Sequence, residues 1–349
     1  MIALFLAVAA SFVFTVGTTP LLIRYLRARG IGQQIRDDGP IPHPHIAKVG
    51  TPSMGGFTIV GGAVVGYFAG HLHRSASIKY ARSGVVLLAL IVGLGAVGFV
   101  DDYLGIRRQR NLGLRKRGKL AGQIFVGSGF ALLALHWVHV STHLSFTRDL
   151  HYDLGSPLWF VWAVLVIIGT TNGVNLTDGL DGLAAGASMF VFAVYTIIAF
   201  WQFRHLPIYN VPGAQALDMA TISAAMLGGC AGFLWWNAAP AQIIMGDTGS
   251  MAIGAAVAGL ALLTRTQLLL PVLGGLYMVE TLSVIAQVIS FRGFGRRVLR
   301  MSPIHHHFEV GGWPEFTVTV RFWLFAGLCA AVGLGLFYAD FLRLPGVHE

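Results

Sequence analysis

Residues 83–102, SGVVLLALIVGLGAVGFVDD, join a long apolar run to a pair of aspartates. About 20 apolar residues cross the hydrocarbon core of a bilayer as a helix. A helix is the expected form because a backbone in lipid must satisfy its own hydrogen bonds. The stretch therefore predicts a membrane-spanning helix that ends on acidic side chains at the membrane surface.

The same kind of apolar segment recurs along the whole chain. Nine others cover residues 2–23, 54–70, 120–140, 157–172, 183–201, 219–236, 249–263, 268–291 and 318–340. Only 11% of the 349 residues are charged, whereas soluble domains carry about 25%. We therefore expect an all-α polytopic membrane protein with about ten transmembrane helices, forming a single integral membrane domain over residues 1–349.

The distribution of Lys and Arg predicts how the spans are oriented. With the N-terminus outside, the inner loops are residues 24–53, 101–119, 173–182, 237–248 and 292–317. These loops hold 16 Lys and Arg residues, and the outer segments hold 7. Cytoplasmic loops carry such an excess, and an even number of spans puts both termini outside. The net charge of +9 is therefore assigned to orientation and anionic headgroups, not to nucleic acid.

Acidic residues gather on the same inner side. Nine of the 15 Asp and Glu lie in or beside the inner loops. Five of them abut predicted spans, namely Asp101, Asp102, Asp178, Asp181 and Asp247. Ionisable groups at the edge of hydrocarbon are costly and usually have partners. Carboxylates from several helix ends on one side predict a shared metal or phosphate site.

The aspartate pair at 101–102 is expected to divide its tasks. Adjacent residues on a helix diverge by about 100°, so one carboxylate can bind a metal or accept a proton while the other holds a cation. The alternative is an interfacial acid pair that is neutralised by the basic loop from Arg107 to Lys119.

Two further inner loops carry polar motifs. In TNGVNLTDGLDGLAAG, residues 171–186, Asn172, Asn175, Asp178 and Asp181 recur every three residues among glycines. Exposed amides of such a turn can meet a phosphate or a base. The alternative is a polar loop that caps a helix.

In FLWWNAAPAQIIMGDTGS, residues 233–250, Pro240 breaks one helix and Gly246-Asp247 opens the next. Asp247 is either an N-cap or a ligand of Mg²⁺, which prefers one or two carboxylates together with substrate phosphate oxygens.

Three consecutive histidines, His305, His306 and His307, lie in MSPIHHHFE, residues 301–309. They can bind pyrophosphate or move a proton, or they form a solvated polar loop.

These motifs, in this order and together with KVGTPSMGG at 48–56, resemble the phospho-N-acetylmuramoyl-pentapeptide transferase branch of the polyprenyl-phosphate N-acetylhexosamine-1-phosphate transferase superfamily. The resemblance implies transfer of the phospho-sugar of UDP-N-acetylmuramoyl-pentapeptide to undecaprenyl phosphate, which yields UMP and lipid I. It also implies Mg²⁺, a multi-pass position in the bacterial cytoplasmic membrane, an active site on the cytoplasmic face and possible homodimers.

The resemblance further implies individual roles. Asp247 is the expected magnesium ligand, Asp101 the base or nucleophile, and Asp102 its support. The histidine His305 is expected to act with them at the donor. The residues expected to bind substrate are Lys48, Asn172, Asn175, Asp178, Gly179, Leu180, Asp181, Asn237, Gln287, His306 and His307, with Glu280 facing the same region and Lys119 attracting anions.

The chain departs from the superfamily pattern at two positions. Gly105 stands where a Lys usually follows the aspartate pair, so Arg107 or Arg108 is the candidate replacement. Ile244 stands where an aromatic residue often precedes the last aspartate.

Two other functions are possible alternatives. A sister enzyme would use UDP-N-acetylglucosamine, which the histidine motif disfavours. A secondary transporter would place its charges near the bilayer midplane, whereas these acids lie at inner helix ends.

Overall fold

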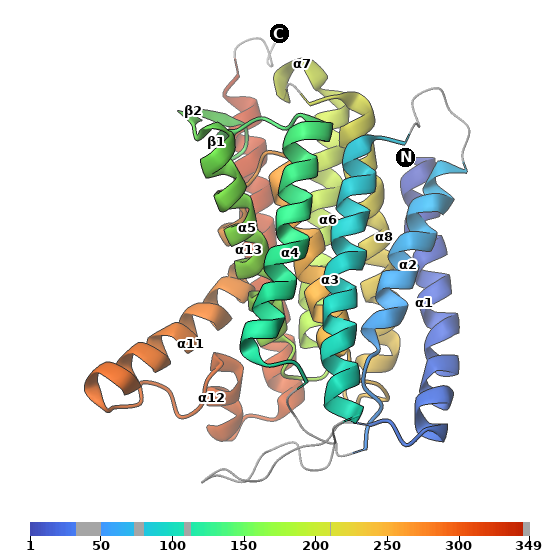
Figure 1. Cartoon of the computed structure of the whole chain (residues 1–349), viewed down its shortest axis with the longest axis vertical. Coiled ribbons are helices and arrows are strands. Elements are labelled where there is room, and N and C mark those ends of the chain that lie inside the picture. Colours follow the sequence, from blue (N-terminus) through green and yellow to red (C-terminus); the bar gives the residue numbers. More distant parts are fainter. Residues whose placement is uncertain (33–49, 73–79, 108–112, 210, 345–349) are drawn as a thin grey trace.

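The computed structural model describes residues 1–32, 50–72, 80–107, 113–209 and 211–344. Long helices run side by side in one bundle (Figure 1). Within the described residues, eight helical segments are long and apolar enough to cross a membrane. They are α1 (Ile2–Ala28), α3 (Arg82–Arg107), α4 (Lys116–Leu133) with the π-helical turn Ala134–Val138, α5 (Gly155–Thr177), α6 (Leu183–Arg204), α8 (Gly213–Asn237), α9 (Gly246–Leu263) and α13 (Glu315–Leu342). The expected all-α polytopic class is confirmed.

Two of the ten expected spans look different from the rest. The first is α2 (Gly56–His71), a shorter helix that packs against α1 and α8. The second, expected as one segment over 268–291, is divided at Gly274 into α10 (Leu270–Leu273) and α11 (Gly275–Phe294). Helix α11 projects sideways from the bundle (Figure 1). The number of spans therefore stays a prediction.

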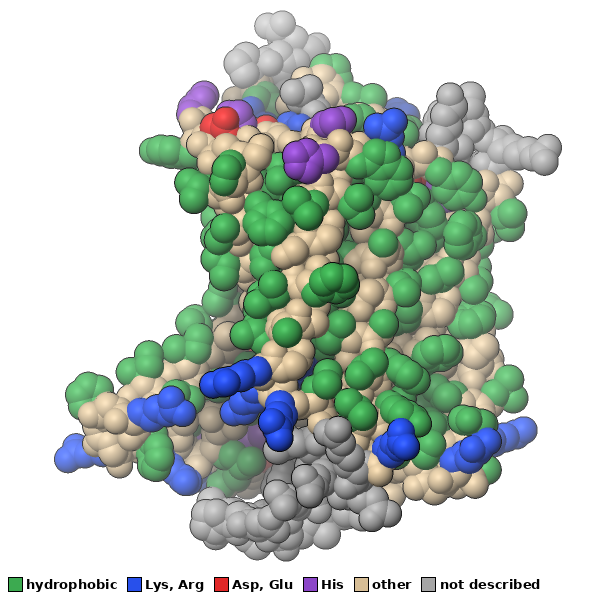
Figure 2. All heavy atoms as spheres, in the orientation of Figure 1, with side chains coloured by type: hydrophobic (Ala, Val, Ile, Leu, Met, Phe, Trp, Pro, Cys, Tyr) green, Lys and Arg blue, Asp and Glu red, His purple; other side chains and the backbone are tan. Residues whose placement is uncertain are grey.

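The first and the last long helices show which end of the bundle is which. Helix α1 begins, and α13 ends, at the same end of the bundle (Figure 1). The short helix α12 (Ile304–Val310) lies at the opposite end. Figure 2 shows Lys and Arg side chains gathered around that opposite end, over α11 and the neighbouring helix ends. Which end faces the cytoplasm stays a prediction.

A small hairpin stands at the end where the chain begins. It consists of β1 (His143–Ser145) and β2 (Asp149–Asp153), which pair antiparallel, and the short helix α7 (Leu206–Tyr209) lies at the same end. Arg148 in the turn donates from Nε and Nη2 to the two carboxylate oxygens of Asp340, at 2.8 and 2.9 Å. This bidentate pair fastens the hairpin to the last turn of α13.

The most buried span is α9. In its apolar window 89% of the residues are buried, compared with 22% in α13 and 28% in the segment that includes α4. Many large apolar side chains of the outer helices are exposed, for example Leu324 at 69% and Phe125 at 80%. Because no aqueous surface would tolerate so many of them together, these faces are the lipid-contacting surface, and α9 is the axis of the bundle.

Glycines let α8 approach α1 closely. A methyl group added at Gly228 would lie 2.3 Å from the backbone oxygen of Val8. Membrane helices use small residues in this way because close backbone approach replaces the hydrophobic drive that lipid does not supply.

We expect Gly228→Ala to destabilise the bundle by about 1–3 kcal/mol, since the helices must separate to admit the methyl group. The measurement is the midpoint of thermal unfolding in detergent. Gly129→Ala in α4 is the matched control, because no heavy atom lies within 4 Å of the added methyl. An equal midpoint for the two variants would contradict the packing role of Gly228.

Candidate active site

Two helix ends meet at the end of the bundle where α12 lies. Asp101 and Asp102 stand in the last turns of α3, and Gly246 and Asp247 begin α9. A methyl group added at Gly98 would lie 2.2 Å from the backbone oxygen of Asp247. The two backbones therefore touch, and this contact brings the acidic motifs at 101–102 and 247 together.

Asp102 holds the first turn of α9. Its Oδ1 accepts a hydrogen bond from the amide of Asp247 at 3.0 Å. Its Oδ2 accepts from the amide of Thr248 at 3.0 Å and from the Thr248 hydroxyl at 2.6 Å. The first amides of a helix have no partner within the helix. Asp102 satisfies two of them from a neighbouring helix. Helix α9 therefore does not need the Asp247 side chain as an N-cap.

Asp101 faces the other way, toward the Asp247 side chain. The two carboxyl groups lie within hydrogen-bonding reach of each other. Asp101 Oδ1 also accepts from the amide of Leu114 at 2.8 Å. The adjacent aspartates thus have different partners, as their divergence on a helix predicts.

Asp247 also contacts a lysine and an amide. Its Oδ2 accepts from Nζ of Lys119, and its Oδ1 accepts from Nδ2 of Asn175. Asn175 Nδ2 is also 2.8 Å from the hydroxyl of Ser250. The side chains of Lys119 and Asp247 keep 19% and 20% of their surface exposed. A ligand can therefore reach this group of two carboxylates, one ammonium and one amide.

The direct contact made by Lys119 is the largest feature that the sequence did not predict. Lys119 lies in the first turn of α4, and only a general attraction for anions was expected of it. It supplies a cation at the site although Gly105 replaces the usual lysine. Arg107 ends α3, and Arg108 lies outside the described residues.

The loop after α5 is tied to the loop after α8. The carboxylate of Asp181 accepts from the amide of Ala241 at 2.9 Å. Asn237 accepts from the amide of Gly182 at 3.0 Å and donates to the oxygen of Ile243 at 2.9 Å. The motifs at 171–186 and 233–250 therefore form one structure.

Asp178 follows the last residue of α5, and Leu180 and Asp181 are buried. Glu315, which the sequence did not single out, accepts from the amide of Asp181 at 2.8 Å. Asn172 lies near Asn175 on α5 but turns to α4, where it donates to Gln123 at 3.1 Å. A nucleotide contact for these residues stays a prediction.

The three histidines point to three different partners. His305 Nδ1 lies 3.0 Å from a carboxylate oxygen of Glu280, and both side chains are completely buried. His306 Nδ1 lies 2.7 Å from Glu309. His307 Nδ1 accepts from the amide of Arg300 at 3.0 Å. His305 therefore has no exposed surface with which to touch a donor in this structure.

Gln287 contacts the chain backbone. Its Oε1 accepts from the amides of Val298 and Leu299 at 3.1 and 2.9 Å, and its Nε2 donates to the oxygen of Leu299 at 3.1 Å. The expected substrate contact of Gln287 stays a prediction.

Lys48 of the segment before α2 lies outside the described residues. Ile244 pairs through its backbone with Pro52 and Gly55, at 2.8 and 2.9 Å, which joins the TPSMGG segment to the start of α9.

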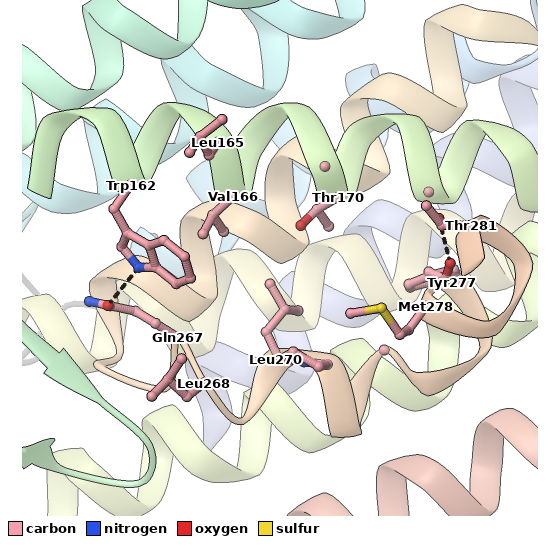
Figure 3. A pocket seen from close by; sticks show the side chains of 14 residues that line it. Trp162, Leu165, Val166, Thr170, Gln267, Leu268, Leu270, Tyr277, Met278 and Thr281 are labelled. Atoms are coloured by element: carbon pink, nitrogen blue, oxygen red, sulfur yellow. Dashed lines mark hydrogen bonds between the residues drawn. The ribbon is translucent and has the colours of Figure 1, made fainter. Parts of the chain in front are cut away.

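An apolar groove of about 280 Å³ lies between α5 and the α10–α11 break (Figure 3). Its wall includes Trp162, whose indole donates to Gln267 at 3.0 Å. Gly173 and Thr281 also line it. Gly173 lies on the same turn of α5 as Asn175, an Asp247 partner, but about 200° around the helix, so the groove lies beside this turn on its α11 side.

The donor set fits magnesium. Among the described residues, no group of three or more His, Cys, Asp or Glu could hold a metal ion. Mg²⁺, however, is often held by one or two carboxylates and completes its shell with water and substrate phosphates. Asp101 and Asp247 offer two adjacent carboxylates, which repel each other unless a proton or a cation lies between them.

Comparisons with known proteins identify the family of this chain. The sequence model of glycosyl transferase family 4 matches residues 84–265. A relative named phospho-N-acetylmuramoyl-pentapeptide-transferase from Streptomyces griseus subsp. griseus is 49% identical, over 96% of this chain and 97% of the relative. Relatives of the same name from Frankia alni and Corynebacterium kroppenstedtii are 49% and 46% identical, over 97% and 98% of this chain and 97% and 99% of their own lengths. The chain belongs to the phospho-N-acetylmuramoyl-pentapeptide transferase family.

Proposed function

We propose that this protein transfers phospho-N-acetylmuramoyl-pentapeptide from UDP-N-acetylmuramoyl-pentapeptide to undecaprenyl phosphate. The products are UMP and lipid I, and the reaction is the first membrane step of peptidoglycan synthesis. The observation that carries the proposal is the meeting of Asp101, Asp247, Lys119 and Asn175 at helix ends, in a chain nearly half identical to named transferases over almost its full length.

The chemistry requires two anions to approach each other. Phosphoryl transfer depends on alignment and on neutralising the charge of the transferred group. Lys119 supplies one cation at the site. Mg²⁺ would be held by Asp247 with Asp101 beside it, and when bound it neutralises the donor diphosphate. Asp101 accepts the proton of the lipid phosphate or acts as a nucleophile.

The lipid acceptor and the soluble donor approach from different sides. The groove beside α11 is apolar, as the polyprenyl chain of an acceptor requires, and it lies beside the turn of α5 that carries Asn175. The surrounding Lys and Arg side chains (Figure 2) favour an anionic donor and support the proposal that this end faces the cytoplasm. We therefore place the protein in the bacterial inner membrane with its site open to the cytoplasm.

The experiment is UMP release by purified protein supplied with undecaprenyl phosphate and each of two donors. We expect release with UDP-N-acetylmuramoyl-pentapeptide and none with UDP-N-acetylglucosamine. The Asp247→Asn variant gives the background signal. Release from UDP-N-acetylglucosamine alone would assign the chain to the sister activity and overturn the proposal.

Removal of metal is expected to stop the reaction. Without Mg²⁺, the charges of the donor diphosphate and of the adjacent carboxylates remain uncompensated. We expect EDTA to abolish UMP release and added Mg²⁺ to restore it, whereas K⁺ at equal ionic strength restores nothing. Full turnover in EDTA would show that Lys119 and the other side chains suffice without a divalent cation.

A further inference from the structure

Helix α11 carries a polar stripe in a segment that is otherwise largely apolar. Glu280, Ser283 and Gln287 are spaced three and four residues apart, which puts them on one face. Ser283 Oγ accepts from the amide of Ile304 at 3.0 Å. Glu280 contacts His305 in α12, and Gln287 contacts the backbone of residues 298–299. The stripe therefore contacts α12 and the loop before it at three successive positions.

The contact of Glu280 with His305 is the most deeply buried of the three. Both side chains have 0% of their surface exposed, and the carboxylate oxygen lies 3.0 Å from Nδ1. A buried carboxylate is retained only where a partner compensates the loss of water. A protonated imidazole at this distance is such a partner, and the two groups meet at ion-pair distance without the alignment of a hydrogen bond.

The opposite edge of the same ring presses on the loop after α5. A methyl group added at Gly179 would lie 2.3 Å from Nε2 of His305 and 2.8 Å from its Cε1. The imidazole is thus enclosed between the carboxylate of α11 and the backbone of Gly179. Three residues further on, Gly182 donates to Asn237, in the segment that leads to Asp247. Displacing the ring would therefore shift a loop that belongs to the site.

We propose that Glu280 is a positioning residue of the transfer reaction. It holds the His305 ring against Gly179, and the ring sets the place of residues 178–182 relative to α12. Glu280 is completely buried, so it acts through His305 and does not touch the substrate. This inference rests on the proposed function for its kinetic consequence, but the contact itself is testable without turnover.

The first experiment is a double-mutant cycle on kcat and on KM for the UDP donor. Glu280→Gln keeps the size of the side chain and removes its charge, and His305→Ala removes the ring. We expect each to lower kcat about 100-fold, the cost of misplacing reacting groups by about an ångström. The double variant should lose no more than the more severe single variant. Multiplicative losses, or wild-type kcat in Glu280→Gln, would overturn the proposal.

Glu280→Asp keeps the charge and should recover part of the lost kcat, which loss of a purely space-filling side chain would not allow. Leu282→Ala, on the same helix with 52% of Leu282 exposed, is the matched control and should turn over like the wild type. A Glu280→Asp variant no faster than Glu280→Gln would count against a role for the carboxylate.

The second experiment is hydrogen–deuterium exchange in detergent without substrate. Glu280→Gln should exchange faster than wild type in residues 178–182 and 298–310, whereas Leu282→Ala should not. Unchanged exchange in both segments would overturn the positioning role. If wild-type protein released no UMP but these segments still depended on Glu280, the proposed function would fail and the positioning contact would stand.

Discussion

Asp247→Asn is expected to abolish UMP release while the protein still folds. The Asp247 carboxylate accepts from Lys119 and Asn175 and adjoins Asp101. Asparagine replaces one acceptor oxygen with a donor and removes the charge that a magnesium ion requires. We expect a loss of about a thousandfold, equivalent to about 4 kcal/mol of transition-state stabilisation.

Asp101→Asn should show a loss of similar size, because it removes the proton acceptor beside Asp247. UMP release per mole of purified protein is the measurement, with thermal unfolding as the check on folding. Asp153→Asn, in the hairpin at the other end of the bundle, is the matched control and should retain full activity. Near-normal turnover in Asp247→Asn or Asp101→Asn would refute the role given to that residue.

Asp102→Ala should cost both stability and activity. Its carboxylate accepts three hydrogen bonds from Asp247 and Thr248. Alanine leaves two helix-start amides and a hydroxyl without this acceptor, and each such buried group costs about 1–3 kcal/mol. We expect a lower unfolding midpoint and a large fall in kcat, because the first turn of α9 carries Asp247.

A graded series separates the two effects of Asp102. Asp102→Asn keeps one acceptor oxygen and should lose less stability than Asp102→Ala. Thr248→Val removes only the hydroxyl donor and should lose least. An unfolding midpoint and kcat at wild-type values in Asp102→Ala would mean that α9 holds its position without this contact.

The sequence was sufficient to predict the helical membrane class. The apolar composition indicates a chain in lipid, and a backbone in lipid must satisfy its own hydrogen bonds, which favours helices. It also predicted which helix ends carry the acids. The order of motifs, compared with a known family, then predicted the transferase branch. Gly246 begins α9 and Asn237 ends α8 around Pro240 as expected.

Contacts between helices could not be predicted in the same way. Nothing in the spacing of Lys119 and Asp247 indicates that α4 and α9 place their first turns together. The division of residues 268–291 at Gly274 was missed although Pro271 and the pair Gly274-Gly275 are the residues that typically break a helix. The hairpin at 143–153 was missed because both strands are short and largely polar.

The most direct test of the account is the stoichiometry of its two products. Purified protein in vesicles with undecaprenyl phosphate, Mg²⁺ and UDP-N-acetylmuramoyl-pentapeptide is assayed for UMP and, by mass spectrometry, for lipid-linked phospho-N-acetylmuramoyl-pentapeptide. We predict equal amounts of both products, and neither without undecaprenyl phosphate or in Asp247→Asn. UMP without the lipid product would show hydrolysis of the donor and would contradict transfer at the Asp101–Asp247 site.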